Sequence, residues 1–150
     1  MAKYADGTNY AASLNPNSTN LLSHGYFGGK VRVMQDLYTF GATSLNSTDY
    51  LIMGGKLPTG SQVVAIELTA GAPLTTAVAT LVVGDEGDDN RYLTSTILTT
   101  NAVAVGPNVP GGMVYRVTGT TDNYIRVGGA ATNTVISGAS VKISVAYVVE

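Results

Sequence analysis

Apolar and polar residues alternate with a period of two along several short segments, which is the pattern of strands that bury one face. The most regular segment is 141–149, where valine, isoleucine and tyrosine alternate with less apolar residues. Such a regular strand is expected inside a sheet. A second segment places Val64, Ile66 and Leu68 on one face, with Glu67 on the other. The pattern therefore predicts a β protein.

The block from Tyr50 to Leu93 contains the densest series of strand and turn signals. It opens with the apolar run 50–53, and Leu57-Pro58-Thr59-Gly60 fits a type I turn with proline second and glycine fourth. Segment 77–83 is apolar on both faces, which predicts a central strand. Residues 84–90 then form an exposed acidic loop. We expect this block to be the framework of the sheet system.

The first long strand is expected at Lys30–Phe40. Val31 and Val33 share one face, whereas Tyr38 and Phe40 have the opposite parity. This change of phase predicts a β-bulge near Gln35-Asp36.

The clearest hairpin joins segment 113–117 to segment 124–127 through the turn at 120–123. Ile125 and Val127 are expected to point inward from its second strand. Shorter strands are expected at 91–98, 102–105 and 134–136.

These eight to ten strands, in a chain dominated by threonine, valine and glycine, predict an all-β fold: a jelly-roll-like antiparallel β-sandwich. We expect one sandwich domain at 30–150 after an extended N-terminal arm at 1–29. The arm is rich in glycine, asparagine and serine, with room for one helical turn near 10–14, and a frayed terminus is the alternative. Its four spaced aromatic residues favour an arm that docks on a partner: Tyr4, Tyr10, Tyr26 and Phe27.

The composition excludes several classes of function. Charged residues are 12 % of the 150 residues and the net charge is −2, so the surface must be mostly uncharged, which favours oligomers or docking. The lysines and arginines are scattered, so no nucleic-acid partner is expected. Cysteine is absent, which excludes disulfides and thiol catalysis. Neither a hydrophobic signal core nor a membrane-length apolar run is present, so we expect a soluble protein made in the cytoplasm of whatever cell synthesises it.

The sequence offers no convincing active or metal site. His24 is the only histidine, and a catalytic triad or a histidine metal site needs partners for it. The acidic loop could offer oxygens to calcium, but its spacing fails the EF-hand pattern, and neighbouring carboxylates on one loop cannot straddle a sugar. A solvated turn in which Asp88 or Asp89 pairs with Arg91 is the simpler interpretation. Asp36, Asp49 and Glu67 are isolated in sequence. No catalytic residue, metal or cofactor is therefore expected; the loop's polar residues are Asp85, Glu86, Asp88, Asp89 and Asn90.

Three stretches together carry a resemblance to a known family. They are 29–33 with 38–40, then 55–63 with the pattern LPxGxxV, then 82–85 ending in VGD and followed by the RY strand of 90–93. In this order they resemble the head decoration (cement) proteins, auxiliary capsid proteins of tailed bacteriophages. The resemblance covers about residues 29 to 95, and its motifs are turn and strand signatures without catalytic content.

The resemblance implies a jelly-roll-like body whose copies assemble as trimers on the outer capsid surface and bridge neighbouring major capsid subunits. The chain would then be a structural virion protein without enzymatic activity, and the major capsid protein would be its partner. Assigning Tyr4, Tyr10, Tyr26 and Phe27 to that contact is our own inference from the arm.

Two other classes remain open. A head-fibre or tail-associated module that binds host glycan would need an exposed aromatic platform, for which Tyr92, Tyr115 and Tyr124 are candidates. A hydrolase on a jelly-roll scaffold is disfavoured by the shortage of histidine, cysteine and paired acids.

Overall fold

The computed structural model describes residues 2–6, 31–41, 45–70, 79–98, 103–113, 115–119, 123–130 and 137–149. The strands in these ranges are β1 (Ala2–Asp6), β2 (Val31–Thr39), β3 (Asp49–Lys56), β4 (Ser61–Ala70), β5 (Ala79–Gly84), β6 (Leu93–Leu98), β7 (Val103–Gly106), β8 (Tyr124–Gly129) and β9 (Ser140–Val149). One short helix, α2 (Pro110–Met113), follows β7. No helix in these ranges has the length and apolar character needed to cross a bilayer.

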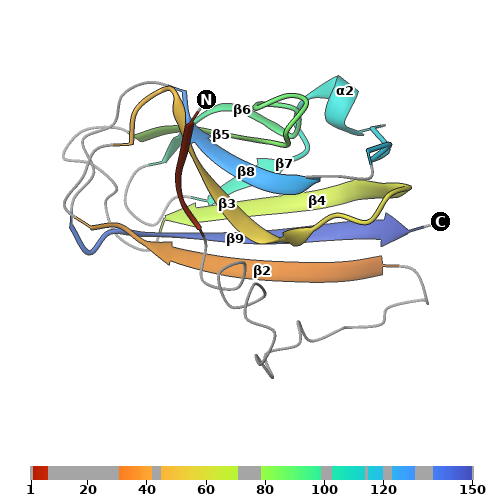
Figure 1. The fold of residues 1–150 in the computed structure, drawn as a ribbon, viewed down its shortest axis with the longest axis horizontal. Coiled ribbons are helices and arrows are strands. Elements are labelled where there is room, and N and C mark those ends of the chain that lie inside the picture. The colour runs from red at the N-terminus through yellow and green to blue at the C-terminus, as the bar shows by residue number, and fades with distance from the viewer. Residues whose placement is uncertain are drawn as a thin grey trace.

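The strands form two sheets that pack face to face as a sandwich (Figure 1). The five-stranded sheet has the order β1-β3-β8-β5-β6, and the four-stranded sheet has the order β2-β9-β4-β7. All pairs among strands β2 to β9 are antiparallel, and β1 runs parallel to its partner, β3. The predicted all-β sandwich is confirmed.

The eight strands after β1 are paired as a nested series. β5 pairs with β6, β4 with β7, β3 with β8, and β2 with β9. The chain thus behaves as one long antiparallel hairpin that is rolled up, so that successive pairs fall alternately in one sheet and the other. This arrangement is the jelly roll, in which eight strands in two sheets follow Greek-key connections.

The interior is filled by the residues that the alternating pattern places inward. Val141, Ile143 and Val145 of β9 are fully buried, and β9 lies between β2 and β4, as predicted for this strand. β5 lies between β8 and β6 and is buried from Leu81 to Val83, in keeping with a strand that is apolar on both faces. Ile125 of β8 is also inward, as expected.

The predicted bulge near Gln35-Asp36 is wrong. β2 pairs with β9 without any shift of register from Val31 to Thr39, and the even-numbered residues face inward throughout. Val33 is therefore exposed, and Asp36 is buried in a position where an apolar residue was expected. The apparent change of phase arose because an inward carboxylate and an outward valine broke the alternation.

A bulge does occur, but in β4. The pairing of β4 with β9 shifts between Val63 and Ala65, so Val63 and Ile66 both face the core while Val64 and Ala65 both face outward. The expectation that Val64 shares a face with Ile66 is therefore wrong, since the extra residue reverses the phase at that point.

The predicted hairpin between 113–117 and 124–127 is also wrong. β8 pairs with β3 and β5 and does not pair with the segment before it. Arg116 instead makes an isolated antiparallel bridge with Gln62, and Val117 exchanges backbone hydrogen bonds with Ser61 and Gly60. The alternation at 113–117 reflects a short extension beside β4.

The turn before β4 is displaced by one residue from its prediction. Ser61 N–H donates to Pro58 O at 3.1 Å, so the turn spans 58–61 and Gly60, with φ of +83°, occupies its third position. A positive φ at that position is the requirement of a type II turn, not of type I.

Candidate functional site

The arm residues that we expected to bind a partner fall mostly outside the described ranges. Tyr4 belongs to β1, whose backbone extends the five-stranded sheet along β3. Tyr10, Tyr26 and Phe27, the helical turn expected near 10–14, His24 and the strand expected at 134–136 lie outside those ranges. The division into an arm at 1–29 and a domain at 30–150 stays a prediction.

The acidic loop between β5 and β6 is organised around Asp85. Its Oδ1 accepts hydrogen bonds from the backbone N–H groups of Gly87 (3.0 Å) and Asp88 (3.2 Å). Its Oδ2 accepts from Arg91 Nε at 2.8 Å and from the Tyr92 hydroxyl at 2.9 Å. The carboxylate is buried, with 5 % of the residue exposed, and it satisfies the turn, the guanidinium and the phenol together.

This cluster corrects our expectation for the loop. The acid that pairs with Arg91 is Asp85, and the predicted pairing with Asp88 or Asp89 is not seen. The VGD and RY motifs are the two halves of one buried ion-pair network, so their residues are needed to close the loop.

Neighbouring segments pack tightly on this network. The guanidinium carbon of Arg91 lies 3.7 Å from the centroid of the Tyr115 ring, a cation–π contact. A Cβ atom placed on Gly84 would come within 2.0 Å of the Asp88 carbonyl oxygen, and one on Gly112 within 2.1 Å of the Arg91 carbonyl oxygen. The glycines thus allow α2 and the end of β5 to approach the loop backbone.

The network also raises the pKa values of Arg91 and Tyr92. Burial, with the neighbouring Asp85 carboxylate, raises the pKa of the Tyr92 phenol well above its ordinary value. Partial burial opposes the charge of Arg91, but the hydrogen bond and attraction from Asp85 outweigh it and the pKa of Arg91 is raised. Arg91 therefore stays charged beside Asp85, next to a phenol that stays neutral.

The raised pKa of Tyr92 predicts a loss of stability in alkali. The phenol is neutral in the folded protein, whereas in the unfolded chain it ionises near pH 10, so stability is fully present below about pH 10 and falls as the pH rises further. One such group contributes a slope of up to about 1.4 kcal/mol per pH unit. Urea unfolding at pH 8, 10 and 11 measures it. Tyr92→Phe should flatten the decline above pH 10, and parallel curves for the two proteins would contradict the prediction.

The geometry of the loop bears on calcium binding. Both Asp85 oxygens already accept two hydrogen bonds each, and no cluster of three or more histidine or acidic residues suited to a metal occurs in the described part of the chain. We therefore expect the melting temperature to be the same in millimolar Ca²⁺ and in a chelator, as measured by calorimetry. A rise in Ca²⁺ that is abolished by Asp89→Asn would reverse this conclusion.

A second buried carboxylate ties the two sheets together. Asp36 of β2 accepts a hydrogen bond from Gly54 N–H of β3 at 2.8 Å, and Gly55 N–H donates to Met34 Sδ at 3.3 Å. β3 leaves its register with β8 between Ile52 and Lys56, so these two N–H groups turn to the opposite sheet. Gly54 has a φ of +80°, which favours glycine at this position. This hydrogen bond could not be predicted from sequence, because Asp36 is isolated along the chain.

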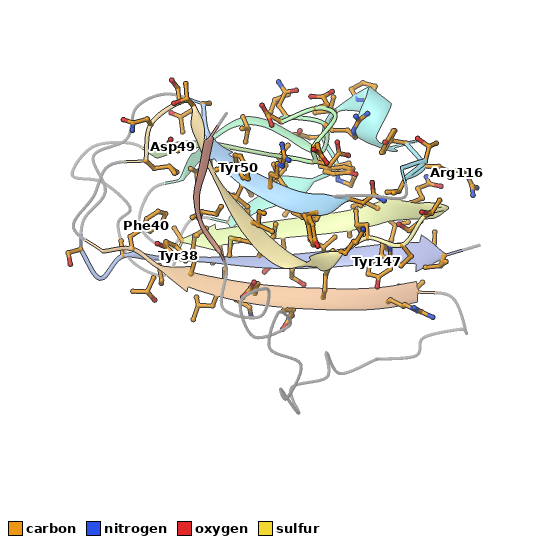
Figure 2. All side chains as sticks on the ribbon, in the orientation of Figure 1. Tyr38, Phe40, Asp49, Tyr50, Arg116 and Tyr147 are labelled. Carbon is orange, nitrogen blue, oxygen red and sulfur yellow. The ribbon has the colours of Figure 1, made fainter. Side chains whose placement is uncertain are left out.

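The outward side of β8 carries aromatic and cationic side chains. The guanidinium carbon of Arg126 lies 4.5 Å from the ring centroid of Tyr50 in β3, and Arg126 Nη2 lies 3.7 Å from Glu86 Oε1. Lys56 Nζ lies 5.8 Å from the ring centroid of Tyr124. Figure 2 labels Tyr50 beside Asp49 on β3.

The tyrosines expected to form an aromatic platform for a glycan are poorly placed for that role. Tyr92, one of three candidates for an aromatic platform, is fully buried, so that part of the expectation is wrong. Tyr115 is covered by Arg91, and Tyr124 is half-buried beside Lys56.

The four-stranded sheet carries exposed hydrophobic side chains on its outer side. In the described ranges, all five large hydrophobic side chains that are exposed belong to this sheet and point away from the core. We call this surface, formed by the outward residues of β2, β9, β4 and β7, the outer face. Its exposed hydrophobic residues are Val33, Leu37, Val64, Val103 and Val105.

Comparison with known proteins shows the fold. Neither family models nor curated sequences match the chain. In the cyanophage Pam1 capsid asymmetric unit, one chain matches with a TM-score of 0.67 and 24 % identity, covering 91 % of this chain and 97 % of that one. In the capsid of Ralstonia phage GP4 the values are 0.69, 16 %, 99 % and 99 %. In the acidic stable capsid of Helicobacter pylori bacteriophage KHP30 they are 0.50, 14 %, 84 % and 90 %.

Proposed function

We propose that this protein is a structural component of a tailed-phage virion, which binds the outer surface of the capsid and stabilises it by bridging major capsid subunits. The observation that carries the proposal is the fold match over nearly the whole chain to proteins of two phage capsids. The motif resemblance of residues 29–95 to decoration proteins supports the same assignment independently of the fold comparison.

The described residues suit a mechanical role. Catalysis needs polar groups that are free to react, whereas the buried carboxylates Asp36 and Asp85 are both engaged by hydrogen bonds inside the fold. The VGD and RY motifs close a loop and the LPxGxxV motif makes the turn before β4. We therefore propose a non-enzymatic protein whose function lies in its surfaces.

Stabilisation of a shell follows from added interface. A standard contact buries roughly 800 Å² on each partner. When one copy touches two capsid subunits, the second contact is effectively intramolecular, so weak contacts add up. We propose that the N-terminal arm, with Tyr4, Tyr10, Tyr26 and Phe27, contributes one such contact, because tyrosine provides contact area at a low cost in side-chain entropy.

The test of this proposal is the protein content of purified virions. Mass spectrometry should detect the chain in a fixed ratio to the major capsid protein, and particles lacking it should lose their DNA at a lower temperature than complete ones. Virions that do not contain the chain would refute the proposal.

A homo-oligomer, specifically a trimer, is part of the same proposal. Because charged residues are only 12 % of the chain, we expect association to persist in 1 M salt. Light scattering at micromolar concentration measures the mass; a monomer at all concentrations would contradict the expectation.

A further inference from the structure

Beyond the bulge, over residues 65–70 of β4, the outer face is a regular grid because β2, β9 and β4 keep one register there. Val33 of β2 lies opposite Ala146 of β9, and Ala146 lies opposite Ala65 of β4, which makes one apolar row across three strands. Two rows along, Leu37 lies opposite Lys142, which lies opposite Thr69. The row between them is polar and consists of Gln35, Ser144 and Glu67, so the face combines apolar and polar rows.

The remaining corner of the grid is also apolar. β7 is an edge strand of the sheet, and its outward residues Val103 and Val105 are 53 % and 67 % exposed. They lie opposite Thr69 and Glu67 of β4. These two valines extend the exposed hydrophobic surface of the face to the edge of the sheet.

The charges on these four strands are few and balanced. Lys142 of β9 and Glu67 of β4 are both exposed and occupy neighbouring rows of the grid. Lys142 has no ion pair in the described part of the chain, and Glu67 accepts one long hydrogen bond, from Thr69 Oγ1 at 3.4 Å. Arg116 lies at the corner of the face opposite Gln62 and already has an interaction within the chain.

The face is large enough for a stable contact. The four strands have nine, ten, ten and four residues, so with a spacing of about 4.8 Å and a rise of about 3.3 Å per residue they cover roughly 500 Å² in projection. This projected area is of the same order as the roughly 800 Å² of accessible surface that each partner buries in a standard interface.

We propose that the outer face packs against the same face of a second copy of this chain. Two sheets that stack with nearly aligned strands about 10 Å apart form the interior of any β-sandwich. A two-fold axis parallel to the strands, between β9 and β4, brings β2 of one copy over β7 of the other and β9 over β4.

This stacking brings complementary residues of the two outer faces opposite one another. Leu37 then meets Val103 of the second copy, Ala146 meets Ala65, and Lys142 comes within reach of Glu67. Because the contact is isologous, each complementary pair occurs twice. It is a different contact from a ring of three, and on a surface covered with such rings it would join neighbouring rings side by side.

Charge reversal tests the proposal with purified protein alone, so its outcome is independent of whether the chain is found in virions. Lys142→Glu places two like-charged acidic pairs in the contact, and Glu67→Lys places two basic pairs. Each single variant should associate with itself at least about tenfold more weakly than the wild type at low salt. An equal mixture of the two variants should recover the wild-type affinity, because both pairs across the contact are attractive again.

Analytical ultracentrifugation measures these affinities, and circular dichroism verifies the fold of each variant. Thr48→Glu and Thr48→Lys, at an exposed position outside the outer face, are the matched controls and should associate as the wild type does. Val103→Lys should weaken association, and mixing it with either charge variant should not restore it. A wild type without any even-numbered species, charge variants that associate normally, or a mixture no stronger than its components would overturn the proposal.

Discussion

Replacing Asp85 with alanine should lower the free energy of unfolding by about 3–5 kcal/mol, because it removes one partner of a buried ion pair. The Arg91 guanidinium and the Tyr92 hydroxyl both donate to Asp85 Oδ2 and would lose that acceptor. Two backbone N–H groups of the loop would lose theirs as well. Urea unfolding monitored by circular dichroism at neutral pH measures the change.

Asp88→Ala is the matched control, since Asp88 is an exposed acid in the same loop whose carboxylate accepts from Asn90 N–H at 3.2 Å. Its loss should cost less than about 1 kcal/mol, as for other exposed polar contacts. Equal effects of the two substitutions would show that the loop is held by its overall charge and not by the Asp85 network.

Gly112→Ala should destabilise the protein by about 3 kcal/mol or more, because the new methyl group would overlap the Arg91 carbonyl oxygen and the backbone of α2 or of the loop must move. The adjacent Gly111→Ala provides a sensitive control. A Cβ atom at Gly111 meets nothing within 4 Å, and alanine favours helix over glycine by up to about 1 kcal/mol.

The two variants are therefore expected to have effects of opposite sign at neighbouring positions. Thermal unfolding of both, compared with the wild type, decides the matter. A Gly112→Ala protein as stable as Gly111→Ala would mean that α2 is not packed on the Arg91 backbone.

Periodicity was sufficient to predict the fold class and most strands. β9 was predicted correctly because it is buried on one face only and its apolar residues keep strict parity from Val141 to Val145. β5 was predicted from its continuous apolar run, which is typical of a strand covered on both faces. In both cases the pattern depends on burial alone, which is the property that local sequence records best.

The errors occur where a long-range interaction overrides local parity. Asp36 faces inward because Gly54, eighteen residues away, donates a hydrogen bond to it. The bulge at Val64 and the pairing of β8 are equally decided by partners distant in the chain. A turn signal predicts that the chain reverses, but it does not identify the strand that receives the returning segment.

For the candidate site as well, local sequence predicted some features, whereas others depended on long-range pairing. The low charge of the chain predicted a surface suited to docking, but the outer face could not be located without the pairing of β2, β9, β4 and β7. Conversely, the acidic loop was the most conspicuous polar feature of the sequence, but its Asp85 is buried and holds the loop closed through hydrogen bonds. Its network was hidden because Asp85 and Arg91 share it with Tyr92, which the strand pattern treats as an ordinary aromatic residue.

The nested pairing of the strands has a consequence for how the chain folds. β5 and β6 are close in sequence and can pair early, whereas β2 must wait for β9, and Gln35 lies 109 residues from its hydrogen-bond partner Ser144. Such a high contact order places the protein among slow folders, on the scale of milliseconds to seconds. On a ribosome, the edges of β2 and β4 that β9 will occupy stay unpaired until residues 140–149 have emerged. Nascent chains are then exposed to strand exchange with one another during this interval, and chaperone supply should limit the yield of native protein.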